Sequence, residues 1–289
     1  MKTYLDEFRL ASASDEESFI LSFPHQLEMG CYTKNVYPFK IFPQKKLNKI
    51  EFAPITIFYG SNGSGKSTLL NVIAEKLTIL RLAPWNKTPY FEDYLRFCDY
   101  VGRIPKTAKL ITSDDVFDFL LDIRSINSEI DQYRSNLFAE YKEARETHFQ
   151  LTTLDDYAEF KRRNEAKRTT KSSYVTRRLP KELSGKSNGE SAFSYFTNEI
   201  KEDTLYLLDE PENSLSPMLQ AELAAFLEDS ARFYNCQLVI STHSPFLLSI
   251  KNAKIYDLDS VPVITRPWTD LENVRAYFKL FYKNADAFH

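Results

Sequence analysis

The strongest constraint on the fold comes from residues 60–67, whose sequence GSNGSGKS fits the pattern GxxxxGK followed by Ser or Thr. A β-rich run, residues 50–59, precedes this stretch, and residues 67–82 carry leucines and an isoleucine at helical spacing. In such a strand, loop and helix context, backbone N–H groups of the loop and of the helix N-terminus converge on anionic oxygens. The pattern therefore predicts a phosphate-binding loop.

Each residue of this loop is a predicted contact to a nucleotide. The Lys66 ammonium is expected to reach the β- and γ-phosphates, the Ser67 hydroxyl is expected to bind Mg²⁺, and Thr68 is a further expected phosphate contact. The predicted nucleotide-binding residues of the loop are Gly60, Ser61, Asn62, Gly63, Ser64, Gly65, Lys66, Ser67 and Thr68.

Glycine is scarce in this chain. Only 7 of the 289 residues are glycine, and five of these fall in two short clusters. Average glycine usage is about 7%, so we expect each glycine to stand where the backbone needs its conformational freedom. The second cluster, residues 183–191, is a polar loop ahead of a helix predicted to start near Ala192.

A pair of carboxylates follows an apolar run, residues 205–208, and consists of Asp209 and Glu210. In P-loop enzymes an acid at the end of such a strand holds Mg²⁺, so we assign that role to Asp209. Glu210 would point away from Asp209 if the strand continued, and it is the predicted general base for the attacking water. The alternative is a surface Asp-Glu pair at the end of a strand.

A histidine follows the next apolar run. Residues 238–240 lead to His243, and a helical segment, residues 217–234, separates this run from the strand that ends at Asp209. Runs that are apolar on both faces suit a parallel sheet covered by helices, and the carboxyl ends of parallel strands form one ligand-binding edge. We therefore predict that His243 senses a γ-phosphate, with a packing histidine as the alternative.

Composition and charge indicate a soluble globular protein. Hydrophobic residues make up 43% of the chain and charged residues 27%, which is too apolar for a disordered protein. The formal net charge of −3 excludes a strong overall attraction to nucleic acid or anionic lipid. The N-terminus has acidic residues where a signal peptide needs apolar ones, and no apolar run has membrane-spanning length. We therefore expect a cytoplasmic protein without a membrane partner.

Three cysteines, Cys31, Cys98 and Cys236, are widely spaced and follow no metal-binding pattern. We expect them to be reduced, packed thiols.

The remaining elements are predicted from apolar periodicity. Residues 19–58 are predicted to form several short strands, and residues 116–157, which contain almost no Gly or Pro, are predicted to be helical. Further expected elements are strands at residues 108–112 and 254–258 and a C-terminal helix at about residues 271–282.

Residues 161–186 form the one basic stretch of the chain. They contain ten Lys or Arg and two acids, which gives a net charge of +8. Such a stretch can neutralise phosphates and make binding salt-dependent. It can equally dock an acidic protein or form a solvated arm, so a nucleic-acid partner, a protein partner and a plain solvated surface all remain open.

Four elements in a fixed order resemble the ATP-binding cassette (ABC-type) ATPases. They are the P-loop at residues 60–67, the stretch SNGES at residues 187–191, which resembles the LSGGQ-type signature, the Asp209-Glu210 pair, and His243, which looks like the switch histidine. The resemblance covers about residues 18–289. The chain looks like the standalone soluble bacterial ATPases of the AAA family and is more distantly similar to chromosome-maintenance and DNA-repair ATPases.

The resemblance implies an α/β P-loop NTPase fold with an ABC-type core, an N-terminal antiparallel β subdomain and a helical subdomain. We expect one domain over residues 1–289. Within it we place the β subdomain and P-loop at about residues 18–112 and a helical insertion at about residues 113–186. The signature, the acidic strand and the switch histidine then occupy about residues 187–289.

The resemblance also implies an ATPase that uses ATP and Mg²⁺. In this family the P-loop of one protomer and the signature of another enclose the same ATP, so Ser187, Gly189 and Glu190 are expected contacts to a nucleotide. The catalytic residues are then Lys66, Glu210 and His243. The expected output is an ATP-dependent homodimer, a switch that acts on a protein or nucleic-acid partner in DNA maintenance or in antiviral defence against mobile elements.

The sequence departs from the family pattern at several places. Asn188 replaces a glycine of the signature, and the D-loop equivalent, residues 213–217, has serine where aspartate is usual. No glutamine follows a strand at the Q-loop place, and Asp114 is the proposed substitute as a metal ligand. For stacking on adenine the candidates are Tyr37 and Phe39, with core packing as the alternative.

Two other functions compete with the ATP-gated switch. A nucleotide-binding subunit of a membrane transporter would normally carry a Q-loop glutamine, a signature closer to LSGGQ and a D-loop aspartate, and this chain lacks all three. A nucleotide or polynucleotide kinase would need an acceptor pocket and lid arginines in place of the switch histidine.

Overall fold

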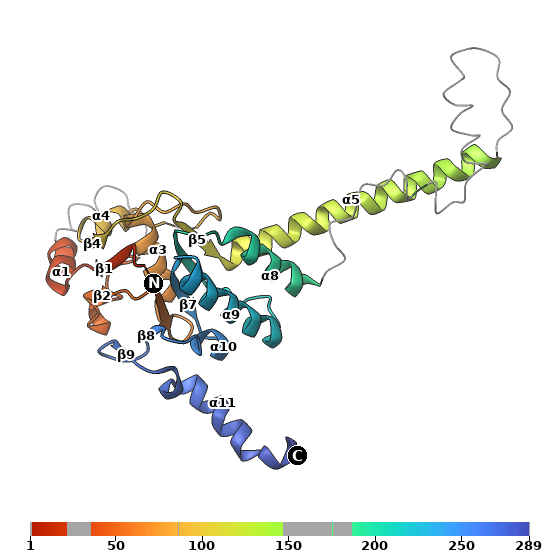
Figure 1. Ribbon diagram of the computed structural model, residues 1–289. Coiled ribbons are helices and arrows are strands. Elements are labelled where there is room, and N and C mark those ends of the chain that lie inside the picture. The colour runs from red at the N-terminus through yellow and green to blue at the C-terminus, as the bar shows by residue number, and fades with distance from the viewer. Residues whose placement is uncertain (1, 22–35, 86, 147–174, 176–186, 289) are drawn as a thin grey trace. The chain divides into compact units, whose positions relative to one another are not determined.

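The computed structural model describes residues 2–21, 36–85, 87–146, 175 and 187–288 (Figure 1). The chain divides into two compact units, residues 1–117 with 188–289 and residues 118–187. Both sheets, the P-loop, the acidic pair and His243 belong to the first unit. Within the described ranges, no helix combines the length and the apolar character needed to cross a bilayer.

The described part of the first unit is built on a six-stranded sheet with the order β5-β6-β7-β3-β8-β9. Its parallel strands are β5 (Lys109–Thr112), β6 (Leu205–Asp209), β7 (Gln237–Thr242), β3 (Ile55–Tyr59) and β8 (Lys254–Asp257), and β9 (Ile264–Thr265) runs antiparallel to β8. All residues of β3 and β7 are buried, as in parallel strands that are covered on both faces. The predicted α/β class with a parallel sheet is confirmed.

A second sheet holds three antiparallel strands in the order β2-β1-β4 among the described residues. Its strands are β1 (Leu5–Arg9), β2 (Lys49–Glu51) and β4 (Asp99–Gly102). The expected N-terminal antiparallel sheet is present, but it is formed largely by residues for which no strand was predicted.

The prediction of short strands over residues 19–58 is confirmed for β2 and β3 and wrong for residues 19–21 and 36–48, whereas residues 22–35 lie outside the described residues. The helix α1 (Ala13–Leu21) covers residues 19–21, and a 3₁₀ turn, η1 (Pro43–Lys45), lies within residues 36–48. Phe39 and Phe42 are buried although they lie in turns, so their apolar spacing reflects contacts of a loop with the core. Proline also removes backbone N–H donors that a strand would use.

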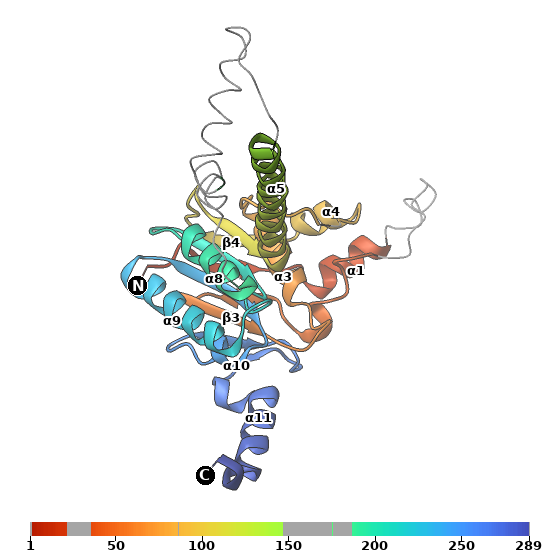
Figure 2. The same ribbon diagram turned by 90° about the vertical axis from the view of Figure 1, so that its right-hand side faces the viewer.

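Six further helices of the first unit lie after β3 in the described chain. They are α3 (Lys66–Lys76), α4 (Phe91–Arg96), α8 (Asn188–Glu199), α9 (Pro217–Phe233), α10 (Pro245–Leu248) and α11 (Glu272–Lys283), with 3₁₀ turns at η3 (Trp268–Asp270) and η4 (Ala285–Phe288). α8 and α9 lie side by side (Figures 1 and 2). The helices predicted at residues 217–234 and 271–282 are confirmed.

Two helix ends differ from the prediction. α3 ends before residue 82, because Thr78 has a φ of 53° and leaves the helical region. α8 begins at Asn188, ahead of the predicted Ala192.

The long helix α5 (Ser113–Glu146) begins in the first unit directly after β5 and continues into the second. The buried carboxylate of Asp115 accepts hydrogen bonds from the Thr112 N–H at 2.7 Å and the Ala83 N–H at 2.9 Å. These bonds fix the first turn of the helix. The helix predicted at residues 116–157 is confirmed to the end of α5, and the remainder lies outside the described residues.

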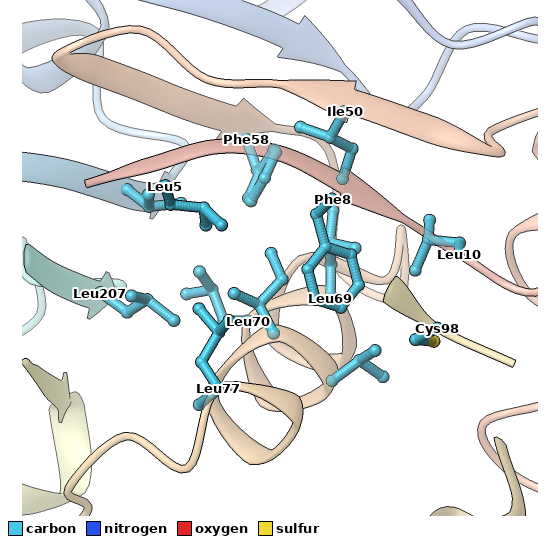
Figure 3. Packing of buried hydrophobic residues seen from close by; sticks show 14 of the residues in the cluster. Leu5, Phe8, Leu10, Ile50, Phe58, Leu69, Leu70, Leu77, Cys98 and Leu207 are labelled. Carbon is cyan, nitrogen blue, oxygen red and sulfur yellow. The ribbon is translucent and has the colours of Figure 1, made fainter. Parts of the chain in front are cut away.

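The largest cluster of buried apolar side chains joins both sheets to α3. Figure 3 shows Leu5 and Phe8 of β1, Phe58 of β3, and Leu69 and Leu70 of α3 in this cluster. None of the five has exposed surface. Because protein cores are close-packed, the cluster fixes the position of α3 and therefore of the P-loop that leads into it.

Two cysteines of the described chain, Cys98 and Cys236, are buried and form no disulfide. Burial raises the pKa of Cys98 to about 12 and that of Cys236 to about 11. The prediction of reduced, packed thiols is confirmed for these two, whereas Cys31 lies outside the described residues.

Gln237 links the two sheets. This fully buried side chain begins β7, and its Oε1 accepts hydrogen bonds from the Tyr4 and Leu5 N–H groups at 2.7 and 2.8 Å. Its Nε2 donates to the carbonyl oxygens of Leu5 at 2.7 Å and Ala53 at 3.2 Å. The amide thus satisfies four backbone groups that would otherwise lose hydrogen bonds on burial.

Replacing Gln237 with Leu should destabilise the fold by about 2 kcal/mol or more, because backbone N–H and C=O groups remain buried without partners. Urea unfolding followed by circular dichroism measures the loss. The control is Gln44→Leu at an exposed position of η1, which should leave the unfolding midpoint nearly unchanged. Equal midpoints for the two variants would contradict the role of Gln237.

Candidate functional site

The P-loop, residues 60–67, connects the end of β3 to the start of α3. Gly63 and Gly65 have φ values of 81° and 98°, in the left-handed region that favours glycine. A Cβ on Gly60 would lie 2.4 Å from the Ser64 Oγ, so this position also excludes a side chain. The first glycine cluster therefore occupies positions where the backbone requires glycine.

Lys66 is buried inside the loop. Its Nζ donates hydrogen bonds to the carbonyl oxygens of Gly60 at 2.8 Å and Ser61 at 3.2 Å. The same atom lies 3.6 Å from the Glu210 Oε1. The ammonium is thus held between the P-loop backbone and the acidic pair that follows β6.

Asp209 accepts hydrogen bonds from two hydroxyl groups. The Ser67 Oγ donates to its Oδ1 at 3.1 Å, and the Ser241 Oγ donates to the same oxygen. Burial raises the pKa of Asp209, and these two hydrogen bonds oppose the rise. Ser241 was missed at the sequence level, although it pairs with Asp209 in the parallel register of β6 and β7.

The arrangement of Ser67 and Asp209 suits Mg²⁺, which prefers oxygen ligands and binds through one or two carboxylates together with phosphate groups. In the described part of the chain, no group of three or more His, Cys, Asp or Glu side chains forms a metal site by itself. A metal ion at this place would therefore share its coordination between these two residues and the phosphates of a nucleotide.

Glu210 does not continue the strand. Its φ of 47° turns the backbone at the end of β6, so a continuing strand, the condition under which Glu210 would point away from Asp209, is not present. The turn leaves the Glu210 Oε1 near Lys66, and the Oε2 accepts a hydrogen bond from the Asn213 Nδ2 at 3.3 Å. The carboxylate therefore faces the P-loop.

A cavity of about 450 Å³ lies over the loop. Its lining consists of Ile41, Asn62, Gly63, Ser64, Gly65, Lys66, Ser67, Thr68 and Glu210. Most of the predicted nucleotide contacts are thus brought together in one place. Ile41 is an apolar member of this lining that periodicity could not identify, because it comes from a turn that is distant in sequence.

The two adenine candidates differ in position. The Tyr37 Oη donates a hydrogen bond to the Thr68 Oγ1 at 3.2 Å, which places Tyr37 beside the P-loop. Phe39 is buried in the core, where its ring stacks on that of Phe19 at a centroid distance of 4.6 Å. Core packing therefore accounts for Phe39.

His243 directly follows β7, the strand between β6 and β3. Because Thr242 pairs with Tyr59, His243 leaves the sheet beside the start of the P-loop. Its side chain is half exposed, and its Nδ1 lies 3.3 Å from the buried carboxylate of Glu212. Glu212 was also missed, although the pattern Asp-Glu-Pro-Glu contains it.

The signature residues lie at the start of α8. Ser187 and Glu190 are exposed at the start of α8. A Cβ on Gly189 would lie 2.9 Å from the Leu219 Cδ1 and 3.4 Å from the Ser214 carbonyl oxygen, so this glycine permits close packing on the D-loop equivalent and α9. Neither Gly189 nor Glu190 lines the P-loop cavity.

Asp114 comes two residues after Thr112, which pairs with Asp209 across β5 and β6. It is exposed in the first turn of α5 and makes no hydrogen bond to Ser67 or Asp209 within the described residues. A different carboxylate reaches the loop: Asp259 accepts hydrogen bonds from the Ser61 N–H at 2.7 Å and the Ser61 Oγ at 2.9 Å. Asp259 follows β8, which pairs with β3, and only this strand pairing brings it to the loop.

Comparison with known families gives one match. Residues 103–249, just over half of the chain, match the family described as "AAA domain, putative AbiEii toxin, Type IV TA system". The match includes Asp209, Glu210 and His243 but not the P-loop. No curated protein matches the chain.

Several solved structures are similar to the chain. The Smc head domain with an extended coiled coil from Pyrococcus furiosus, bound to the C-terminal domain of ScpA, is 14% identical over 96% of this chain and 99% of that chain, with a TM-score of 0.42. The cbiO1 protein from Clostridium perfringens, part of the ABC transporter complex cbiONQ, is 17% identical over 82% and 84%, with a TM-score of 0.36. Stu0660 of Streptococcus thermophilus is 15% identical over 74% and 72%, with a TM-score of 0.39.

Replacing Asp209 with Asn should raise the stability of the protein in the absence of nucleotide and metal. Because burial raises the pKa of Asp209 above its ordinary value, the folded protein binds this proton more tightly than the unfolded chain does. Stability is therefore lost as the pH rises through the raised pKa. Thermal melting in EDTA should show the variant a few degrees more stable at pH 8, with a smaller difference at pH 4, close to the ordinary pKa of an aspartate.

The control for this experiment is Asp229→Asn at an exposed position of α9, which should melt like the wild type at both pH values. A wild type at least as stable as Asp209→Asn at pH 8 would show that the buried charge carries no cost.

Proposed function

The chain belongs to the AAA-domain family and is a P-loop protein of the ABC ATPase type, and on that premise we propose that it hydrolyses ATP and thereby gates its own dimerisation. The observation that carries this proposal is the meeting of two motifs far apart in sequence. Ser67 donates to Asp209 at 3.1 Å, and the Lys66 Nζ lies 3.6 Å from the Glu210 Oε1. This is the arrangement that phosphoryl transfer needs.

We propose the following roles in the P-loop cavity. The backbone N–H groups of residues 60–68 and the Lys66 ammonium hold the phosphates of ATP. Ser67 and Asp209 hold Mg²⁺, which neutralises charge on the phosphate oxygens when bound. Glu210 accepts a proton from the attacking water or orients that water, and Asn213 holds the other carboxylate oxygen in place.

The proposed dimer completes the site with residues that do not line the cavity. Ser187, Gly189 and Glu190 of a second copy would contact the γ-phosphate side of the nucleotide. Because ATP then binds the dimer better than the monomer, it shifts the equilibrium towards the dimer, and hydrolysis reverses the shift. A twofold arrangement contains two equivalent sites.

The biological role that we favour is defence against mobile elements. The description of the matching family names a type IV toxin–antitoxin system, which supports this choice over general DNA maintenance. The absence of a Q-loop glutamine and of a D-loop aspartate weighs against a transporter subunit.

Replacing Glu210 with Gln should slow ATP hydrolysis by about 100-fold or more, because the general base is lost while the loop and metal ligands remain. ATP should then trap the dimer. Multi-angle light scattering with ATP and Mg²⁺ should give twice the monomer mass of 33.7 kDa, and the same sample without ATP should give the monomer mass.

Two comparisons make this test decisive. Adding Ser187→Arg to Glu210→Gln should abolish the dimer without weakening ATP binding, since Ser187 lies outside the P-loop. A mass that does not respond to ATP would contradict the proposed switch, and a dimer that survives Ser187→Arg would contradict the role of the signature.

The basic stretch at residues 161–186, which apart from Val175 lies outside the described residues, is the proposed contact to a nucleic acid. Binding of wild-type protein to DNA and RNA oligonucleotides should weaken steeply with salt. Removing five of its charges should weaken binding by about ten-fold or more in low salt. These substitutions are Lys161→Ala, Arg162→Ala, Arg163→Ala, Lys167→Ala and Arg168→Ala.

Fluorescence anisotropy measures this binding, and the ATPase rate with and without the oligonucleotide measures coupling. If the variant with all five substitutions binds the oligonucleotide as the wild type does and its ATPase rate is stimulated equally, the nucleic-acid contact is contradicted. A protein partner and a solvated surface are then the remaining alternatives.

A further inference from the structure

Glu212 is a buried carboxylate to which the roles proposed above assign nothing. Its residue exposure is 5%, and it lies in the turn between β6 and α9. The turn is held by backbone hydrogen bonds from the Asn213 N–H to the Glu210 carbonyl oxygen at 3.1 Å and from the Leu215 N–H to the Glu212 carbonyl oxygen at 3.0 Å. The turn therefore fixes the backbone from which the Glu212 side chain extends.

One oxygen of Glu212 makes all of its contacts at the end of β7. The Oε1 accepts hydrogen bonds from the Thr242 Oγ1 at 2.6 Å and from the His243 N–H at 3.0 Å. The His243 Nδ1 lies 3.3 Å from the same oxygen. A single carboxylate oxygen therefore contacts both the backbone and the ring of His243.

The other groups around His243 hold its backbone. The Asn273 Nδ2, at the start of α11, donates to the His243 carbonyl oxygen at 2.7 Å, and the Ser244 N–H donates to the Thr242 Oγ1 at 3.0 Å. Among the described residues, Glu212 is the charged side chain in contact with the ring, and the His243 Nε2 has no hydrogen-bond partner. The backbone of His243 is thus fixed, whereas its ring is oriented from one side.

The second oxygen of Glu212 argues against a purely structural role. The Oε2 is buried and has no hydrogen-bond partner within the described chain. A buried carboxylate with an unsatisfied oxygen is costly to the fold, and packing alone would favour a neutral side chain here. Such a group calls for an explanation, and the imidazole beside the other oxygen, Oε1, supplies one.

We propose that Glu212 is a positioning residue for His243. Its carboxylate accepts the Nδ1–H of the ring, so that Nε2, on the other side of the ring, is the nitrogen that takes up a further proton from solvent and donates it to an anionic oxygen at the edge of the sheet where the P-loop begins. A carboxylate that fixes the tautomer and orientation of a functional histidine is a general device. The inference rests on the proposed ATP hydrolysis and on the role predicted for His243 as a sensor of the γ-phosphate, and it adds the residue that orients the His243 ring.

The first test measures the ring itself and needs no ATP hydrolysis. The chain has four histidines, so ¹⁵N-histidine labelling gives few signals, and His243→Asn identifies those of residue 243. The ¹⁵N shifts of the neutral ring should show the proton on Nδ1 in the wild type and a mixture of Nδ1–H and Nε2–H in Glu212→Gln. Gln retains an oxygen that accepts from Thr242 and from the His243 N–H, so the backbone contacts can persist.

The second test measures steady-state ATP hydrolysis. Glu212→Gln should lower kcat by about 10- to 100-fold, the usual loss when the carboxylate that orients a histidine is removed, with little change in KM for ATP. The matched control is Glu222→Gln on an exposed position of α9, which removes the same charge and should change neither the ring signals nor kcat.

The outcomes separate this inference from the proposed function. Identical ring signals in wild type and Glu212→Gln would overturn the role of Glu212 whether or not the protein hydrolyses ATP. If the ring signals differ between wild type and Glu212→Gln but the wild type does not hydrolyse ATP, the contact between Glu212 and His243 is supported and the proposed function is rejected. If Glu212→Gln does not fold, a wild-type neutral ring with its proton on Nε2 still overturns the inference.

Discussion

The parallel register of β6, β7 and β3 is the constraint on which the rest of the structure depends. It sets Asp209 opposite Ser241, and Thr242 opposite Tyr59, so the acidic pair, His243 and the P-loop leave the sheet along one edge. A slip of one residue would turn each side chain to the other face of its strand. The contact between Ser67 and Asp209 exists only because both registers are kept.

Two charged groups of the site are buried, and their burial costs folding free energy. Lys66 is buried among carbonyl oxygens and Asp209 is buried between two serines, and both positions remove a charge from water. The apolar cluster around α3 and the buried amide of Gln237 hold the two sheets together beneath these charges. The stability of the core thus offsets the cost of keeping a polar cavity at the edge of the sheet.

His243 is held by groups from two distant parts of the chain. Glu212 comes from the turn after β6, and Asn273 comes from the first turn of α11, yet both bind His243 or its backbone. Gly189 packs against the same turn region through Ser214 and Leu219. The turn between β6 and α9 therefore contacts His243 through Glu212 and the start of α8 through Ser214.

The sequence by itself determined the local chemistry: the P-loop between a strand and a helix, the acidic pair after a buried run, and a histidine after the next one. These follow from patterns within a few residues, such as the left-handed glycines at 63 and 65 and runs apolar on both faces. It predicted strands over residues 36–48, where the structure has turns, because Phe39 and Phe42 have the apolar spacing of a strand while they pack on the core from turns. Only the tertiary structure decided that Ile41 and Asp259 reach the P-loop and that Glu212 reaches His243. Their positions depend on strand pairing and turn geometry between segments distant in sequence. A pattern within a few residues cannot predict contacts between such segments.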